Sequence, residues 1–297
     1  MTKRSYTPYL FILPAAAMLI VFLYYPVVGA LDISLYEWSG MGPRTFVGFG
    51  NYTNALKSAT FWHSLRLTFL WVLLSTVILP IGGLLLAVLI EYTTKARFMA
   101  GLSRTILFMP MMMSLVAVGL LWSLIFNPTM GLLNAFLVKL QLMNPMEPLN
   151  LLGRANSAIF AAFVPAIWQW SGFGMVITSA AMMSIPQELI EAAAVDGAGK
   201  FKQFFRIILP LLMPTIFTCA MLHLIGGFKA FDLIYTMTAG GPGDATMVSA
   251  LYMFRQAFID HKFGYATAIA AILFLLIFIF TYVFNKLNDR VRENIGI

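Results

Sequence analysis

Long apolar segments constrain the fold of this chain more than any other feature. A helix of roughly 20 apolar residues spans the hydrocarbon core of a bilayer, and it satisfies its own backbone hydrogen bonds where lipid offers no partners. The chain contains six such segments without Asp, Glu, Lys or Arg, at residues 9–30, 67–90, 105–126, 158–180, 207–227 and 265–284. The sequence therefore predicts an all-α, polytopic membrane protein with six transmembrane helices.

The composition agrees with a membrane protein and argues against other classes. Hydrophobic residues make up 60% of the chain and charged residues only 10%, whereas soluble domains carry about 25% charge. The net charge of +7 fits Lys and Arg beside the spans better than nucleic-acid binding, because no aromatic and basic residues alternate as in RNA-binding proteins. Cys219 is the only cysteine, and His63, His223 and His261 are far apart in the sequence. We therefore expect neither a disulfide framework nor a metal site.

The first apolar segment decides the expected topology. It follows Lys3 and Arg4, as the core of a signal peptide does, but it is longer than such a core. We expect an uncleaved first span, and six spans then place both termini in the cytoplasm. Lys and Arg are denser in the segments that this arrangement puts inside, in agreement with the positive-inside rule.

A polar stretch at residues 184–206 separates the fourth and fifth spans, and its charges exclude it from hydrocarbon. Ser184 and Gln187 form a capping-box pattern that predicts a helix over residues 187–195. Gly197 and Gly199 can adopt positive φ and turn the chain. Helical spacing of Phe201, Phe204, Phe205 and Ile208 predicts a second helix over residues 200–208. The stretch must lie in water or against another protein.

This stretch resembles the EAA signature of permease subunits from binding-protein-dependent ATP-binding-cassette (ABC) importers. The pattern E-A-A, three residues, G, nine residues, I, one residue, L-P is met by Glu191, Ala192, Ala193, Gly197, Ile207, Leu209 and Pro210. In that family the loop is the docking surface for the ATPase subunit. The resemblance implies a single permease domain over residues 1–297 with the type I importer fold and a cytoplasmic coupling helix. Asp196, Phe201 and Phe204 belong to the same expected coupling surface.

A second motif follows the fifth span. The sequence FDLIY at residues 231–235, followed by Gly240, Gly241 and Pro242, resembles the F-D-x-I-Y…G-G-G-P segment of the first permease in sugar-importer pairs. Ala239 stands where that family often has the first glycine. Residues 46–52 (FVGFGNY) are similar to another sugar-permease segment after the first span. The resemblance implies a maltose-type or glycerol-phosphate-type permease that pairs with a different second permease; the alternative is a turn without a further role.

Polar and aromatic residues in the spans are candidates for the substrate path, since they are costly in lipid. Trp168, Gln169 and Trp170 can stack on a sugar ring and bond its hydroxyls, or they can belong to an aromatic belt at the interface. Lys229 and Asp232 lie near the outer end of the fifth span and can pair with each other or with a binding protein. His223 fits a packed core position better than a ligand contact.

No catalytic arrangement is legible, so we expect a non-enzymatic subunit. Residues 197–200 (GAGK) superficially resemble a phosphate-binding loop, but the spacing fails and Phe201 replaces the required Ser or Thr. We expect no cofactor in this chain, and the resemblance implies that ATP and Mg are held by partner ATPase subunits.

The expected function is thus half of the translocation pathway of an ATP-driven carbohydrate importer in the inner membrane of a prokaryote. The resemblance implies a second permease, two ATPase subunits, an extracytoplasmic solute-binding protein and membrane lipid as partners, without nucleic acid. Glycerol phosphate or another polyol is an alternative substrate. An ion-gradient transporter would need paired ionisable residues within the spans, and a membrane enzyme would need a nucleophile or a metal cluster; neither pattern is visible.

Overall fold

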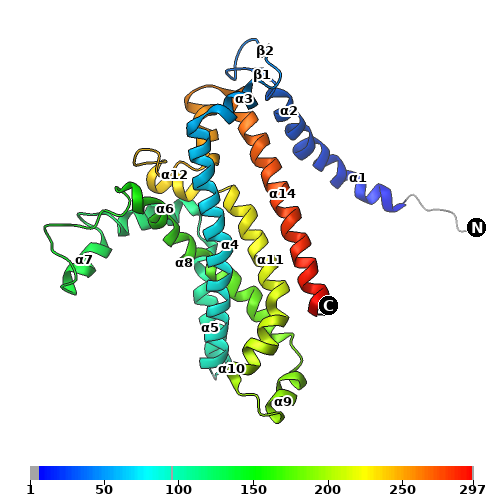
Figure 1. The fold of residues 1–297 in the computed structure, drawn as a ribbon, viewed down its shortest axis with the longest axis vertical. Coiled ribbons are helices and arrows are strands. Elements are labelled where there is room, and N and C mark those ends of the chain that lie inside the picture. The colour runs from blue at the N-terminus through cyan, green and yellow to red at the C-terminus, as the bar shows by residue number, and fades with distance from the viewer. Residues whose placement is uncertain (1–6, 95, 296–297) are drawn as a thin grey trace, which may run out of the picture. The chain divides into compact units, whose positions relative to one another are not determined.

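A computed structural model describes residues 7–94 and 96–295, which are predominantly helical (Figure 1). Among these residues, five helical segments are long and apolar enough to cross a membrane: Phe11–Ile33, Ala59–Thr93, Ala155–Met183, Lys200–Phe228 and Phe263–Glu293. A sixth candidate is a pair of helices, Phe98–Met112 and Leu115–Ile125, which meet at an angle of 98°. The chain divides into two compact units, Met1–Trp62 with Tyr252–Leu275 and His63–Leu251 with Leu276–Ile297.

The first unit contains an apolar helical arm and a small polar cap. Its elements are α1 (Thr7–Leu19), a π-helical turn (Ile20–Tyr24), α2 (Tyr25–Ile33), β1 (Tyr36–Glu37), β2 (Thr45–Phe46), α3 (Gly50–Lys57), a π-helical turn (Arg255–Ile259) and the start of α14 (Phe263–Ile295). Strands β1 and β2 pair antiparallel, with Tyr36 opposite Phe46. No residue from Ile20 to Ile33 is buried by the described chain. Lipid or another subunit must therefore cover this apolar arm.

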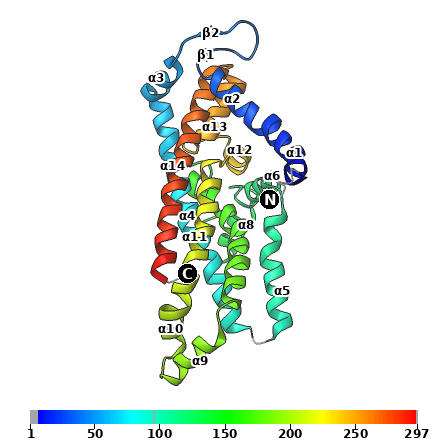
Figure 2. The same ribbon diagram turned by 90° about the vertical axis from the view of Figure 1, so that its right-hand side faces the viewer.

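The second unit is a bundle of long helices with short helices at both ends. It holds most of α4 (Ala59–Thr93), α5 (Arg97–Phe108), a 3₁₀ turn (Met109–Met112), α6 (Leu115–Ile125), α7 (Leu132–Lys139), α8 (Ala155–Met183), α9 (Gln187–Val195), α10 (Lys200–Gln203), a π-helical turn (Phe204–Ile208), α11 (Leu209–Phe228), α12 (Asp232–Thr238), the start of α13 (Ser249–Phe254) and the part of α14 from Leu276 on. Figures 1 and 2 show α9 and α10 at one end of the long helices and α6 and α12 toward the other.

Small residues let the long helices approach closely, as membrane helices require in the absence of a hydrophobic drive between them. A Cβ atom added to Gly83 on α4 would lie 2.5 Å from the carbonyl carbon of Gly174 on α8. Beside this crossing, Ala87, Ile90 and Met175 form a buried cluster. The backbones of α4 and α8 therefore touch where only glycine fits.

The third apolar segment, the span expected over residues 105–126, consists of two helices that meet at a bend and not of one continuous helix. Pro110 lies in the 3₁₀ turn after α5 and has no amide to donate. Met113 is extended, and the Ser114 side chain then caps α6 by accepting a hydrogen bond from the Ala117 amide at 3.2 Å. These local features end one helix and begin another, which produces the 98° bend.

Two expectations for the polar stretch were also wrong in detail. Ser184 does not cap α9; its hydroxyl donates to the Ala181 carbonyl at 2.8 Å, and Pro186 occupies the N-cap position without a side-chain bond. Gly199 is extended with φ of −64°, so of the two glycines only Gly197 has positive φ. The second helix continues through a π-helical turn into α11, which already includes Pro210 in its first turn.

Candidate functional site

Helix α9 ends in a glycine-dependent turn that fixes the shape of the polar stretch. Gly197 has φ of +76°. Its amide donates to the Ala194 carbonyl at 3.0 Å, and the Ala198 amide donates to the Ala193 carbonyl at 2.9 Å. This pair of bonds is a Schellman motif, which satisfies the last carbonyls of the helix and favours glycine at the left-handed position. Gly197 and Ala193 of the EAA pattern thus have a direct structural role.

Gln203 stabilises the turn from the side of α10, and no sequence pattern indicates this role. Its side chain is 9% exposed. The Nε2 group donates to the Ala198 carbonyl at 2.8 Å, and the backbone amide donates to the Gly199 carbonyl at 3.0 Å. Helices α9 and α10 are therefore joined by hydrogen bonds on both sides of Gly197. A glutamine among lysines carries no sequence signal that would have indicated this contact.

The outward surface of this loop is both charged and apolar. Among the described residues, none of its charged side chains forms an ion pair: Glu188, Glu191, Asp196, Lys200, Lys202 and Arg206. Val195 is 88% exposed and Phe201 is 78% exposed. The rings of Phe201 and Phe205 lie 4.5 Å apart, and those of Phe204 and Phe205 lie 5.1 Å apart. Ile207 and Leu209 are half-buried at the base of the loop. Exposed aromatic and unpaired charged groups together indicate a surface that binds a partner.

A cavity of about 460 Å³ lies in the second unit and brings together part of the predicted substrate path. Trp170, Lys229 and Asp232 line it, with Phe173 and His223 beside them. The rings of Trp170 and His223 meet edge to face, with centroids 5.9 Å apart. No ion pair joins Lys229 to Asp232 within the described chain. The cavity thus offers an aromatic wall with a separate cation and anion.

Trp168 and Gln169 point elsewhere. Trp168 packs against Trp122, with ring centroids 6.0 Å apart. Gln169 is 2% exposed, and its Nε2 group donates to the Met113 carbonyl at 2.9 Å. Neither residue lines the cavity of Trp170. Gln169 therefore bonds the backbone at the bend after α5 and does not line the cavity, so the expected contact of its amide with a sugar is not available there.

The segment after α12 forms a tight turn around Gly240, Gly241 and Pro242. Left-handed backbone occurs at Ala239, Gly240, Gly243 and Asp244. The Thr246 amide donates to the Gly240 carbonyl at 3.1 Å, and its hydroxyl donates to the Gly241 carbonyl at 2.9 Å. Ala239, at the position where the family often has glycine, adopts φ of +49° despite its side chain. These bonds hold the turn in one shape.

A buried polar cluster attaches this turn to α4. The Thr68 side chain accepts a hydrogen bond from the Ser249 amide at 2.8 Å and donates to the Ser249 hydroxyl at 3.0 Å. Thr68 therefore supplies the N-terminal cap of α13 from a different helix. The sequence could not indicate this contact, because the two residues are 181 positions apart.

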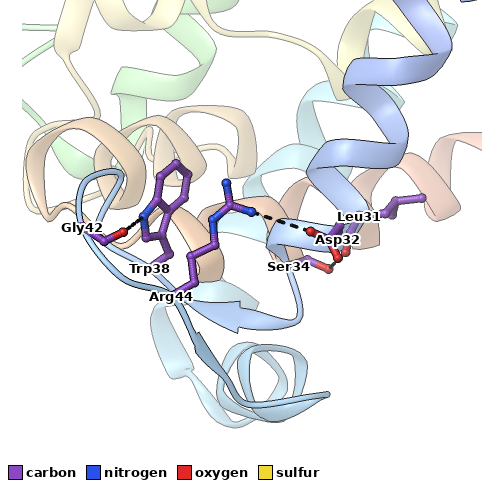
Figure 3. Close-up of polar contacts among 6 residues, drawn as sticks. All are labelled: Leu31, Asp32, Ser34, Trp38, Gly42 and Arg44. Carbon is purple, nitrogen blue, oxygen red and sulfur yellow. Dashed lines mark hydrogen bonds and ion pairs between the residues drawn. The ribbon is translucent and has the colours of Figure 1, made fainter.

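In the first unit, the segment at residues 46–52 anchors the polar cap. Asn51 is buried and donates from Nδ2 to the carbonyls of Ser34 at 2.8 Å and Tyr36 at 2.9 Å. Figure 3 shows the neighbouring contacts of Trp38, Arg44 and Asp32. The Arg44 guanidinium lies 4.6 Å from the ring centroid of Trp38 and 3.7 Å from the Asp32 carboxylate. The segment at residues 46–52 thus has a local structural task.

The described residues contain no group of three or more His, Cys, Asp or Glu side chains placed to hold a metal ion. The two ion pairs found among them, Arg44 with Asp32 and Arg104 with Glu91, lie at the ends of apolar segments.

Comparison with known proteins gives a consistent result. A sequence profile described as "Binding-protein-dependent transport system inner membrane component" matches residues 81–293. The probable ABC transporter permease protein YurN of Bacillus subtilis is 34% identical, with 92% of this chain and 93% of that protein covered. The trehalose/maltose transport system permease protein MalF of Thermococcus litoralis is also 34% identical, with 96% and 94% covered. A crystal structure of a bacterial alginate ABC transporter, in complex with a pentasaccharide-bound periplasmic protein, contains a chain of the same fold. The TM-score is 0.85 at 23% identity, with 97% of this chain and 96% of that chain covered.

Proposed function

The chain belongs to the inner-membrane components of binding-protein-dependent transport systems, and on that premise we propose that it forms half of the translocation pathway of an ATP-driven carbohydrate importer. A relative that covers nearly the whole chain is named for trehalose and maltose transport. The cavity beside Trp170 has the aromatic and polar groups that suit a sugar. The chain itself is the transport subunit, and ATP and Mg belong to partner ATPase subunits.

The observation that carries this proposal is the loop of α9, α10 and Gly197. It presents an exposed short helix, unpaired charges and two large exposed apolar side chains, fixed by the Schellman motif and Gln203. Glu191, Ala192 and Asp196 lie on its exposed surface. A helix of this kind enters a groove on a partner with its apolar face while its charges select the partner. We assign the partner as the ATPase subunit, which places residues 184–206 and both termini in the cytoplasm.

The remaining partners follow from the same proposal. A different second permease completes the pathway, and two ATPase subunits bind the two coupling loops. An extracytoplasmic solute-binding protein delivers the sugar to the outer side, where the turn of Gly240, Gly241 and Pro242 lies. Trp170, Lys229 and Asp232 contact the solute as it passes.

The experiment compares variants of the coupling loop in the assembled transporter, reconstituted into proteoliposomes with its partner subunits. Glu191→Lys reverses an exposed charge. Gly197→Pro is incompatible with φ of +76° and removes the hydrogen bond that the Gly197 amide donates to the Ala194 carbonyl. Both variants should insert into the membrane, yet retain less ATPase subunit on purification and lose sugar-stimulated ATP hydrolysis and transport.

Gly199→Ala is the matched control, because Gly199 is extended and a Cβ there meets no atom within 4 Å. It should bind the ATPase subunit and transport like the wild type. Normal ATPase retention and transport in both Glu191→Lys and Gly197→Pro would show that the loop has no coupling role.

A further inference from the structure

The first unit contains a cavity of about 620 Å³ that shares no lining residue with the cavity beside Trp170. Its walls come from the end of β1, from α3, from the turn before α14 and from the first turn of α14. Polar and aromatic side chains share the lining, including Glu37, Trp38, Asn54, Lys262 and Tyr265. All of them belong to the same compact unit.

The strand side of the cavity is fixed before any ligand binds. Trp38 donates from Nε1 to the Gly42 carbonyl at 3.3 Å, and Arg44 lies over its ring (Figure 3). The ring of Phe263 lies 5.8 Å from that of Trp38, centroid to centroid. Asn51 ties the same strand to α3 through its two carbonyl contacts. A wall whose side chains are held in place loses little freedom when a ligand binds, which favours affinity.

The opposite side is built from an irregular turn. The π-helical turn Arg255–Ile259 places the buried Gln256 in the cavity wall. His261 follows with φ of +52°, a left-handed conformation that costs a non-glycine residue free energy. The Lys262 amide closes the turn by donating to the Gln256 carbonyl at 2.8 Å. π-Helical turns and left-handed residues gather at functional sites, because ordinary selection for stability would remove them.

Several lining groups have hydrogen-bonding capacity that the protein leaves unused. Glu37, Asn54 and Lys262 are exposed residues, and within the described chain their side chains form no hydrogen bond and no ion pair, so in the free protein water satisfies them. Together they offer a carboxylate acceptor, an amide that both donates and accepts, and an ammonium donor. Tyr252 and Tyr265 add two hydroxyls that lie 3.4 Å apart.

From this lining we propose that the cavity is an accessory binding site for a neutral saccharide. Hydroxyl groups of a sugar both donate and accept, so one ligand can use the carboxylate, the amide and the ammonium at once. A singly charged ligand would be attracted by one of Glu37 and Lys262 and opposed by the other, whereas a neutral ligand is opposed by neither. The aromatic rings supply apolar surface for the carbon face of a sugar ring. The inference comes from the lining itself and does not depend on the proposed transport function.

The test uses a thiol reporter at the cavity in the assembled transporter, held in lipid nanodiscs. Ser39 lines the cavity, and its hydroxyl only bonds the carbonyl of Met41 in the same turn. Ser39→Cys is therefore a mild reporter, and the native Cys219 is buried. Met41→Cys is the matched control, because Met41 is 82% exposed and does not line the cavity. The measured quantity is the rate of modification by N-ethylmaleimide with and without maltotriose.

We expect maltotriose to slow modification of Ser39→Cys several-fold and to leave Met41→Cys unchanged. Adding Asn54→Ala or Lys262→Met should raise the sugar concentration for half-protection roughly tenfold or more, since each removes a hydrogen bond to the ligand. Lys57→Met, a change of an exposed lysine outside the cavity, should not raise it. Free sugar and sugar-loaded binding protein are tested separately, and protection by either one supports a saccharide site.

Three outcomes would overturn the proposal. The first is that neither free sugar nor sugar-loaded binding protein slows the modification of Ser39→Cys by N-ethylmaleimide. The second is that Met41→Cys is protected as strongly as Ser39→Cys. The third is that sugar-free binding protein protects Ser39→Cys as well as the loaded form does, which would make the occupant a protein loop. Transport by the Glu191 and Gly197 variants is measured separately. A negative result for the saccharide site therefore leaves the coupling proposal intact, and a negative result for coupling leaves the saccharide site intact.

Discussion

The contact between Gly83 and Gly174 predicts a large asymmetry between two apparently equivalent substitutions. A Cβ on Gly83 would lie 2.5 Å from the carbonyl carbon and 2.6 Å from the Cα of Gly174, and 2.7 Å from the Met175 amide nitrogen. Ordinary contact begins at 3.4 Å, so the shortfall from 2.5 Å is 0.9 Å. All three atoms are backbone, and no side-chain rotation can relieve the overlap. Helices α4 and α8 must move apart.

Gly174→Ala is the matched comparison. Its Cβ would lie 3.2 Å from the Cα of Gly83 and 3.5 Å from the Leu79 carbonyl oxygen, so the shortfall is only 0.2 Å. Moving α4 and α8 apart to relieve the overlap at Gly83 opens a gap between their packed surfaces. A gap of about 0.5–1 Å forfeits about a quarter to a half of the dispersion energy between such surfaces. Overpacking typically costs about 1–3 kcal/mol, and we expect Gly83→Ala in that range. Gly174→Ala should cost much less, because the higher helix propensity of alanine, about 0.5–1 kcal/mol, offsets part of the strain.

The measurement is the free energy of unfolding in mixed micelles titrated with SDS, together with the melting temperature of the assembled transporter. Gly101→Ala on α5 is the control for helix propensity, since a Cβ there meets no atom within 4 Å. It should be neutral or slightly stabilising. Equal destabilisation by Gly83→Ala and Gly174→Ala, or a neutral Gly83→Ala, would refute the reasoning from backbone contact.

Two further substitutions test contacts that the sequence did not indicate. Gln169→Leu should lower stability by about 1 kcal/mol, the net value of one hydrogen bond, because it removes the donor to Met113. The KM for sugar transport should stay unchanged, and a raised KM at wild-type stability would return Gln169 to the substrate path. Thr68→Val should cost about 1 kcal/mol by removing the cap of α13, and proteolysis of residues 239–248 should become faster. Thr76→Val on the same helix is the control, because the buried Thr76 hydroxyl has no partner within the described chain; equal effects of the two changes would contradict the capping role.

Local chemistry determined the parts of the fold that the sequence predicted well. Helix α9 occupies residues 187–195 as expected, and Gly197 takes the left-handed position after it. Both features follow from residues that are neighbours in the chain, namely a run of good helix formers and a glycine one position beyond the last turn. The membrane character followed in the same way, from the length and hydrophobicity of each segment.

Contacts between distant segments could not be read from the sequence. The Met113 carbonyl at the bend accepts a hydrogen bond from Gln169, which lies 56 residues away. Trp168, Gln169 and Trp170 do not line one cavity, for a geometric reason. Successive helical residues are about 100° apart around the axis, so three in a row cannot face one cavity. That rule was available from the sequence, and it would have separated Trp170 from Trp168.

The described geometry also explains how the proposed coupling loop can act on the proposed substrate path. The segment Lys200–Phe228 is 29 residues long and helical throughout, which corresponds to about 43 Å. One end is bonded through Gln203 to Ala198 in the turn that follows α9, and the other end carries His223 and leads to Lys229 in the cavity wall. Because a continuous helix resists bending, a partner that displaces the loop moves this helix as a lever and changes the cavity at its far end. On this proposal, coupling does not require new hydrogen bonds in the cavity wall near the solute. It does require the helix to stay unbroken through the π-helical turn Phe204–Ile208.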